Sequence, residues 1–95
     1  MKHYSVVATK AYTKDVKRLI KSGFDLSKLE QLIDMLALGK ALPSRCHDHA
    51  LRGALKNIRE CHIAPDWLLS YTKDNDRLIL LLIRTGSHRD VLGIE

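Results

Sequence analysis

The spacing of apolar residues along this chain predicts one strand, then two helices, then a series of strands. Residues 3–8 alternate weakly and are rich in Tyr and Val, which predicts the first strand. From Tyr12 to Ile20 the apolar residues recur at about the 3.6-residue helical period, so we expect a helix that Thr9 caps and Gly23 ends. The other face of this helix is basic apart from one acid, Asp15. Its cations are Lys10, Lys14, Lys17, Arg18 and Lys21.

A leucine-rich stripe predicts a second helix. The stripe consists of Leu26, Leu29, Leu32, Ile33 and Leu36. Asp25 or Ser27 is expected to cap this helix, and Glu30 follows Ser27 at the spacing of a capping box. Gly39 and Pro43 are expected to end it. Because about four residues join the two helices, we expect an antiparallel pair whose apolar faces need a partner layer.

The second half of the chain supplies that layer as strands. Residues 51–54, 58–63, 67–73 and 77–84 are strand-like and are separated by short turns. Such short turns join antiparallel neighbours. Residues 77–84 are apolar on both faces, so we expect this strand to lie away from an exposed edge.

Polar and aromatic residues of the second half are spaced so that these hairpins would gather them. They are His49, His62, Asp66, Trp67, Arg84 and His88. Folding the first two hairpins about their turns places His62 opposite both His49 and Trp67. The third hairpin sets Trp67 opposite Leu82, with Arg84 at the same end of the sheet as Asp66. We therefore expect these residues to lie at one end of the sheet, where His88 follows the last strand.

This set has the chemistry that RNA cleavage by internal attack requires. A neutral imidazole can take the proton of the 2′-hydroxyl, and an imidazolium can protonate the departing oxygen. The fork of donors on Arg84 suits a phosphate, and Asp66 can orient a neighbouring histidine. RNA carries its own nucleophile, so no metal is required. Each residue alone also has an ordinary structural interpretation, Trp67 as core and Asp66 as a turn residue, so the prediction depends on the whole set.

Length and composition indicate a single globular domain, residues 1–95. Hydrophobic residues make up 45% of the chain and charged residues 28%, which argues against disorder. The longest apolar run, residues 78–83, is far below the roughly 20 residues of a membrane helix, and no signal peptide is evident, so we expect a cytoplasmic protein. The net charge of +5 and a pI near 9.4 favour an acidic partner, either nucleic acid or protein.

A metal site is the main chemical alternative. Residues 46–49 include Cys46, His47 and His49, but the chain has no Cys-x-x-Cys pair and no His-Glu-x-x-His helix. Adjacent ligands also chelate poorly, so the sequence favours neither a metal nor another cofactor. Two cysteines are too few for a disulfide framework, and we expect free thiols, with Cys61 a small buried hydrophobe. No motif indicates a serine or cysteine nucleophile.

Three ordered segments of the second half carry a family resemblance. They are residues 48–53 (DHALRG), 59–69 (RECHIAPDWLL) and 84–88 (RTGSH), with a fainter match at 12–17 (YTKDVK). At these segments the chain resembles the YafQ branch of the RelE superfamily, the ribosome-dependent mRNA endonuclease toxins of bacterial toxin–antitoxin pairs. The resemblance spans nearly the whole chain, and the ordered series of segments is specific.

The resemblance implies an α/β (α+β) fold in which two N-terminal helices pack on a mainly antiparallel sheet. It also implies an enzyme that cuts mRNA in the ribosomal A site without a metal or other cofactor. By position, the catalytic set of the family falls on His49, His62, Asp66, Arg84 and His88. Trp67 matches a residue of the same pocket, and Leu92 stands where the family has an aromatic that can stack on a base. The implied partners are the ribosome with its mRNA, a cognate antitoxin, and operator DNA through the antitoxin complex.

We therefore expect an endoribonuclease toxin of a type II toxin–antitoxin system. His49 and His62 are the expected proton-transfer residues, although the sequence does not indicate which is base and which is acid. Asp66 orients a histidine or shares its proton, Arg84 holds the scissile phosphate, and His88 assists acid–base work or substrate placement. Substrate contacts are expected from Trp67, Lys14, Lys17, Arg18, Arg52 and Leu92.

The competing interpretation is a non-catalytic module that binds RNA or an acidic protein through the lysine-rich first helix. A face of this kind is most often simply solvated. Phosphate chemistry separates the two interpretations. Cleaved mRNA with 2′,3′-cyclic or 3′-phosphate ends in the presence of a chelator supports the enzyme, whereas intact RNA with salt-dependent binding supports the module.

Overall fold

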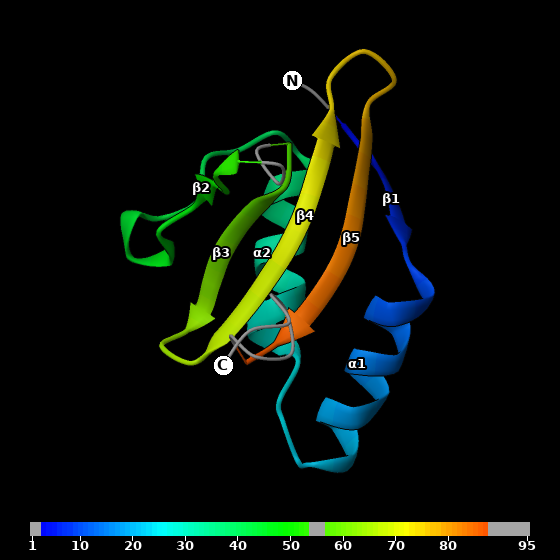
Figure 1. Cartoon of the computed structure of the whole chain (residues 1–95), viewed down its shortest axis with the longest axis vertical. Helices are drawn as coiled ribbons and strands as arrows, with labels where there is room; N and C mark the ends of the chain where they lie inside the picture. Colours follow the sequence, from blue (N-terminus) through cyan, green and yellow to red (C-terminus); the bar gives the residue numbers. More distant parts are fainter. Residues whose placement is uncertain (1–2, 54–56, 88–95) are drawn as a thin grey trace.

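A computed structural model describes residues 3–53 and 57–87, and its elements follow the predicted order (Figure 1). The elements are β1 (Ser5–Ala8), α1 (Lys10–Lys21), α2 (Ser27–Ala37), the 3-10 turn η1 (Ser44–Cys46), β2 (His49–Ala50), β3 (Arg59–Ala64), β4 (Trp67–Asp74) and β5 (Ile79–Gly86). The strands form one sheet in the order β1-β5-β4-β3-β2, in which β1 runs parallel to β5 and the other neighbours are antiparallel. The predicted fold, two helices on a mainly antiparallel sheet, is confirmed.

The start of α1 is fixed to the sheet by its cap. As predicted, the Thr9 hydroxyl accepts a hydrogen bond from the Tyr12 N–H at 3.0 Å. The same hydroxyl donates to the Ile83 carbonyl of β5 at 2.7 Å. Gly23, with a positive φ of 86°, follows the end of this helix. As a result, α1 runs alongside the end of β5, where it can contribute side chains to the sheet (Figure 1).

At the start of α2, Asp25, one of the two predicted caps, makes the capping hydrogen bond, but it lies one residue before the N-cap position. Leu26 occupies the N-cap position and makes no side-chain cap bond, while Ser27 is already helical. The Asp25 carboxylate instead accepts the Ser27 N–H at 2.9 Å. The predicted capping box between Ser27 and Glu30 is therefore wrong, because the aspartate satisfies the first free N–H of the helix.

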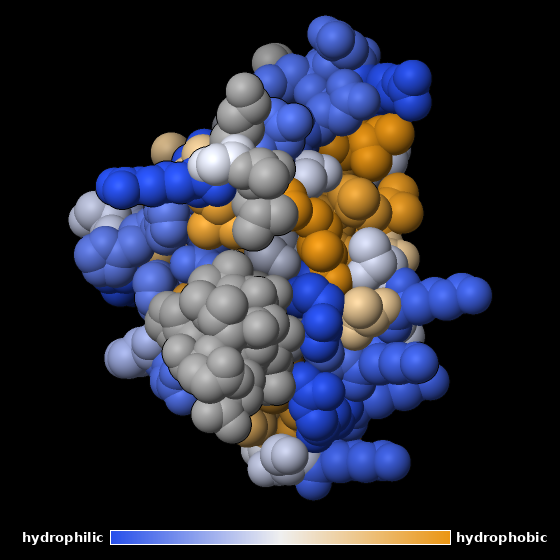
Figure 2. All heavy atoms as spheres, viewed as in Figure 1, coloured by the Kyte–Doolittle hydropathy of each residue, from blue (hydrophilic) through white to orange (hydrophobic). Residues whose placement is uncertain are grey.

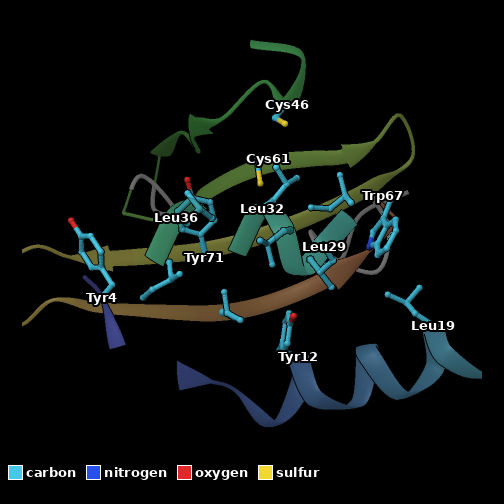
Figure 3. Packing of buried hydrophobic residues seen from close by; sticks show 14 residues of the cluster. Tyr4, Tyr12, Leu19, Leu29, Leu32, Leu36, Cys46, Cys61, Trp67 and Tyr71 are labelled. Carbon is cyan, nitrogen blue, oxygen red and sulfur yellow. The ribbon is translucent and has the colours of Figure 1, made fainter. Parts of the chain in front are cut away.

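One face of the sheet holds the hydrophobic core against the two helices (Figures 1 and 3). The helices contribute Tyr12, Leu19, Leu29, Leu32 and Leu36, and the sheet contributes Cys61, Ile63, Trp67, Leu69, Tyr71, Leu80 and Leu82. Burial of one large apolar side chain stabilises a fold by about 1.5–3 kcal/mol, so this face provides most of the stability. In the described residues, no helix combines the length and the apolar character that crossing a membrane would require.

The strands and their antiparallel neighbours are mostly as predicted, but the register between them is not. β5 lies between β1 and β4, as its two apolar faces predicted. The strand expected at 51–54 is wrong, because the ladder pairs His49–Ala50 with β3 and residues 51–53 belong to no strand. The predicted partners of His49, His62 and Trp67 are also wrong. These residues pair with Glu60, Leu68 and Ala64 respectively, and Leu82 pairs with Tyr71.

Candidate active site

A row of polar side chains crosses four strands on the face of the sheet that points away from the core. His49 of β2 pairs with Glu60 of β3, Glu60 pairs with Ser70 of β4, and Ser70 pairs with Arg84 of β5. Directly paired residues point to the same face, so these four side chains emerge together. Neighbouring strands are about 4.8 Å apart, which separates the backbones of His49 and Arg84 by about 14 Å. The two ends of the row, His49 and Arg84, reach solvent, whereas Glu60 and Ser70 between them are buried.

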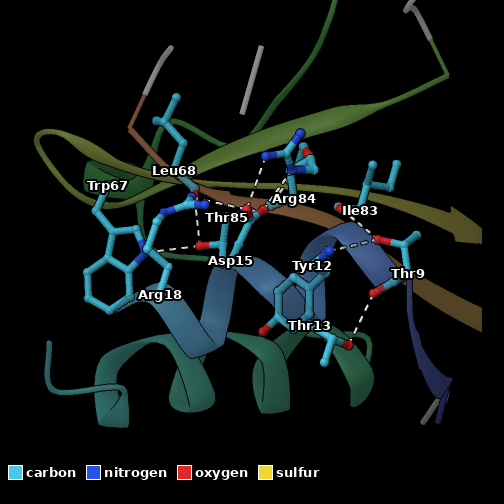
Figure 4. A network of polar contacts seen from close by, with 11 residues as sticks. Thr9, Tyr12, Thr13, Asp15, Arg18, Trp67, Leu68, Ile83, Arg84 and Thr85 are labelled. Atoms are coloured by element: carbon cyan, nitrogen blue, oxygen red, sulfur yellow. Dashed lines mark hydrogen bonds and ion pairs between the residues drawn. The ribbon is translucent and has the colours of Figure 1, made fainter. Parts of the chain in front are cut away.

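Arg84, at the β5 end of this row, is held by a carboxylate from α1 (Figure 4). Its Nε donates to Asp15 Oδ2 at 2.7 Å and its Nη2 donates to Oδ1 at 3.0 Å. This two-point geometry fixes the plane of the guanidinium as well as its position. The Arg84 side chain is 35% exposed, whereas that of Asp15 is 1% exposed. The anchor is thus in the core, and the cation that it holds reaches solvent.

Asp15 has two further donors besides Arg84. The Thr85 N–H donates to Oδ2 at 3.1 Å, and Arg18 Nη2 donates to Oδ1 at 3.1 Å. Burial alone would raise the pKa of Asp15, but the hydrogen bonds and charge of Arg84, together with the other donors, outweigh burial and hold this pKa below its ordinary value. The carboxylate is therefore ionised at neutral pH, and Arg84 has a permanent counter-charge.

The β2 end of the row depends on Asp48. Its carboxylate accepts hydrogen bonds from Arg59 Nε at 3.2 Å and from the Tyr71 hydroxyl at 2.5 Å. Burial, and then the bond to Asp48, raises the pKa of Tyr71, so the hydroxyl keeps its proton and acts as donor. These two bonds attach the segment that carries His47 and His49 to the neighbouring strands.

The orientation of His49 is set by a second local bond. Its Nδ1 lies 2.5 Å from the His47 carbonyl, and because a carbonyl only accepts, Nδ1 must carry the proton. In the neutral ring the lone pair is then on Nε2, which lies 3.6 Å from Glu60 Oε1. The Glu60 carboxylate is buried, and its Oε2 has no hydrogen-bond partner among the described residues. The sheet therefore presents a basic imidazole nitrogen beside a buried carboxylate.

His62 lies on the same face, two residues beyond Glu60 along β3. The edge of its ring meets the ring of His47 with centroids 5.6 Å apart. The two histidines line a pocket of about 480 Å³ between α2, η1 and the end of β3. The predicted sharing of one face by His49 and His62 is confirmed, because both lie on the face of Glu60.

Asp66 and Trp67 lie at the β3–β4 turn and apart from the row. A bulge between His62 and Ala64 turns Trp67 to the helix side, where it is 7% exposed. Its Nε1 donates to Thr85 Oγ1 at 2.9 Å, and its ring meets the edge of Phe24 at 5.2 Å. Asp66 is exposed and lines a small pocket of about 210 Å³ with Trp67. Their expected roles in the site stay predictions.

The remaining predicted residues are on the surface or outside the described part. Lys14 and Lys17 are exposed on α1, Arg52 is exposed just after β2, and Arg18 pairs with Asp15. In Figure 2 hydrophilic side chains cover α1 and the β2–β3 side of this face, while apolar ones gather over β1 and the adjoining part of β5. The predictions for His88 and Leu92 fall outside the described residues.

Among the residues of this site that the sequence analysis missed are two buried acids, Asp15 and Glu60. Asp15 is the only acid on a basic helix face, which was a visible signal of a specific partner. Glu60 lies inside the matched segment 59–69, next to Cys61 and His62. Both are acids that the fold buries against cations or imidazoles, and alternation alone does not identify such positions.

The described residues hold no cluster that suits a metal ion. Within residues 3–53 and 57–87, no three side chains of His, Cys, Asp or Glu gather in the way that a metal would require. Cys46 and Cys61 are buried and unlinked, in line with the expected free thiols. Burial raises the pKa of Cys61 to about 12, so this thiol stays protonated and is a poor nucleophile and ligand.

Comparison with known proteins assigns the family. A family model described as "Bacterial toxin of type II toxin-antitoxin system, YafQ" matches residues 4–93. The mRNA interferase toxin YafQ of Escherichia coli (strain K12) is 41% identical over 83 residues, covering 86% of this chain and 88% of that protein.

Two solved structures are also similar. A metal-bound toxin from Helicobacter pylori has a TM-score of 0.87 and 40% identity, with 93% and 98% of the two chains covered. A chain of the E. coli DinJ–YafQ toxin–antitoxin complex has a TM-score of 0.86 and 34% identity, with 96% and 99% covered. This chain therefore belongs to the YafQ family of bacterial type II toxin–antitoxin toxins.

Proposed function

We propose that this chain is a toxin that cleaves ribosome-bound mRNA by metal-independent attack of the RNA 2′-hydroxyl. The proposal depends mainly on one observation, the row of His49, Glu60 and Arg84 on one face of the sheet. Two hydrogen bonds to the buried carboxylate of Asp15 hold the Arg84 guanidinium in place. The similar E. coli protein is named an mRNA interferase, which supports RNA as the substrate.

Arg84 stabilises the phosphate in this mechanism. Charge accumulates on the phosphate oxygens as the 2′-oxygen attacks, and a preorganised cation favours that state over the ground state. Asp15 is a positioning residue, because it fixes the guanidinium before substrate arrives and leaves Arg84 partly exposed. No reorganisation of Arg84 is then required when the charge develops.

The imidazoles transfer the protons. His49 Nε2 carries the lone pair of the neutral ring and acts as the base that removes the 2′-hydroxyl proton. Glu60, 3.6 Å away, stabilises the imidazolium that forms. His62, on the same face, protonates the departing 5′-oxygen. Asp66 and His88 keep the supporting roles that the family resemblance implies.

The partners follow from the family. One solved relative is part of a toxin–antitoxin complex, so we propose a cognate antitoxin that silences this chain and joins it on operator DNA. Because the proposed substrate is ribosome-bound mRNA, we propose that the protein acts in the cytoplasm. Expression of the chain should stop translation. Co-expression of the antitoxin, which we expect to be a small acidic protein encoded beside the toxin, should restore it.

The test is primer extension on an mRNA after induced expression. Arg84→Ala would leave Asp15 as a buried charge that has lost its main partner, so Arg84→Lys is the better variant because it keeps a cation there. Loss of the two-point geometry should lower cleavage by about 10²-fold. Arg77→Lys, at an exposed arginine of the β4–β5 turn, is the matched control and should cleave normally.

A parallel His88→Ala variant tests the residue that the resemblance adds. Both site variants should bind the antitoxin as tightly as the wild type. Full cleavage by both would refute the site, and intact mRNA with the wild-type chain would indicate a binding module instead.

A further inference from the structure

A cationic pocket adjoins the polar row at the edge of the sheet. It lies between α2, the η1 turn and the end of β3, and it has a volume of about 480 Å³, within the roughly 300–1,000 Å³ range of small-ligand sites. β2 pairs with β3 only at Arg59 and Glu60, so the later part of β3 borders the pocket. His62 belongs to both surfaces, because it lines the pocket and shares the sheet face of the row.

The lining of the pocket combines basic and apolar side chains. The basic ones are Lys28, Arg45, His47 and His62. The apolar ones include Leu32 and Ile63, which are both buried. Among the described residues that line it there is no aspartate or glutamate. The basic side chains of such a pocket attract a phosphate, and its apolar side chains accept the flat face of a base. One nucleotide carries both groups.

His47 connects this pocket to the row. Its backbone is left-handed, with φ 48° and ψ 46°, which is uncommon outside glycine and costs free energy. The strained turn directs the His47 carbonyl to His49 Nδ1 and brings the His47 ring against His62. A ligand in the pocket therefore contacts a residue that is bonded to the proposed base.

We propose that this pocket is the subsite for the RNA nucleotide next to the cleaved bond. Its phosphate binds at Lys28 and Arg45, and its base packs against the apolar lining residues beside His47. RNA is favoured over an acidic protein segment because the lining combines cations, which bind a phosphate, with apolar side chains, which accept a base. His62 also belongs both to this pocket and to the sheet face that carries Arg84. This inference depends on the proposed function and adds a substrate-binding site to it.

The first experiment is cleavage of a ribosome-bound mRNA by the full chain under steady-state conditions. Arg45→Ala should raise KM about tenfold with little change in kcat, because a charged contact to a non-reacting phosphate contributes mainly to binding. His47→Asn removes the imidazole ring that the proposed base would contact, so KM should rise. The chain should still fold, because asparagine tolerates the left-handed backbone at this position. Arg77→Ala removes the same charge from the β4–β5 turn and should change KM by less than about twofold.

The second experiment uses mRNA with one neutral methylphosphonate at each position beside the cleavage site. With the wild-type chain, one such position should weaken cleavage about tenfold. With Arg45→Ala, the same substitution should have no further effect, because the contact is already absent. Additive losses would show that Arg45 does not contact that phosphate and would overturn the subsite.

The remaining outcomes separate the subsite from the proposed function. Equal KM values for Arg45→Ala and Arg77→Ala, with normal wild-type cleavage, overturn the subsite alone. Loss of antitoxin affinity in Arg45→Ala with unchanged cleavage assigns the pocket to a protein partner and also overturns it. Absence of cleavage by the wild-type chain overturns both.

Discussion

The two ends of the polar row are held in place by different means. At the β5 end, Arg84 is bound at two points by a carboxylate that is 1% exposed and has four donors. At the β2 end, His49 lies on a strand of two residues, its side chain is 49% exposed, and Asp48 is its neighbouring anchor. The comparison indicates that the core preorganises the proposed phosphate-binding cation, whereas the proposed base is held by fewer buried contacts.

The largest effect is expected from Asp15→Ala. Removal of the carboxylate leaves the buried Thr85 N–H without its acceptor and Arg84 without its counter-charge. Because Arg84 is partly exposed and water can solvate its charge, the free energy of unfolding should fall by about 2–3 kcal/mol. Without its anchor Arg84 loses its fixed geometry, and kcat should fall by about 10²-fold. Urea unfolding and single-turnover cleavage measure the two effects, and a loss of stability with unchanged kcat would contradict the positioning role.

Asp15→Asn sharpens this test because it keeps the size of the side chain. If Asp15 acts through Arg84, the loss of kcat should largely disappear when Arg84→Lys is already present. A purely structural role predicts the same loss in both backgrounds. The Asp15→Asn chain should remain folded enough for this cycle, since an amide oxygen still accepts the Thr85 N–H.

A smaller effect is expected at the other end from Asp48→Asn. Loss of the charge weakens the bonds from Arg59 and Tyr71, which should cost about 1–2 kcal/mol of unfolding free energy. The looser segment should lower kcat about tenfold through His49. Asp76→Asn, at an exposed position of the β4–β5 turn, is the control. Equal activity of the two variants would show that Asp48 does not position His49.

Glu60→Gln should have a smaller effect again. The amide keeps the shape but removes the negative charge 3.6 Å from His49 Nε2, so kcat should fall about fivefold. Glu30→Gln on the exposed side of α2 provides the control. If the Glu60→Gln chain keeps the wild-type kcat, Glu60 has no role in the mechanism.

The smallest effect concerns pH. Because the pKa of Asp15 is lowered in the folded chain from its ordinary value of 3.8, its stabilising contribution is present above that value and is lost as pH falls through the folded pKa. The difference in unfolding free energy between the wild type and Asp15→Asn should therefore narrow below about pH 4 and stay constant from about pH 5 to 8. A difference that grows on acidification would contradict the ionised carboxylate.

Much of the fold could be predicted from periodicity. The Thr9 cap, the two helices and the central place of β5 are each determined by local patterns that the structure retains. Register could not be predicted, because two bulges add residues that alternation does not reveal. The bulge before Ala64 turned Trp67 from the expected polar face to the core.

The candidate site was predicted in part for the same reason. The predicted pairing of His49 was wrong by two residues, which leaves a side chain on the same face, so His49 and His62 still share it. The β4–β5 turn is longer than expected and includes Leu78 with a positive φ of 55°, which shifts Arg84 to a place opposite Ser70. Asp15 reaches Arg84 only through the docking of α1, which no local pattern reports.

The most direct measurement of the central claim is cleavage of a ribosome-bound mRNA that has a single 2′-deoxynucleotide before the scissile phosphate. The wild-type chain should cut the all-ribose mRNA and leave 2′,3′-cyclic or 3′-phosphate ends, also with a chelator that binds transition metals. It should leave the deoxy-substituted mRNA intact at that position. Cleavage of the deoxy-substituted mRNA at the same phosphate would contradict the account.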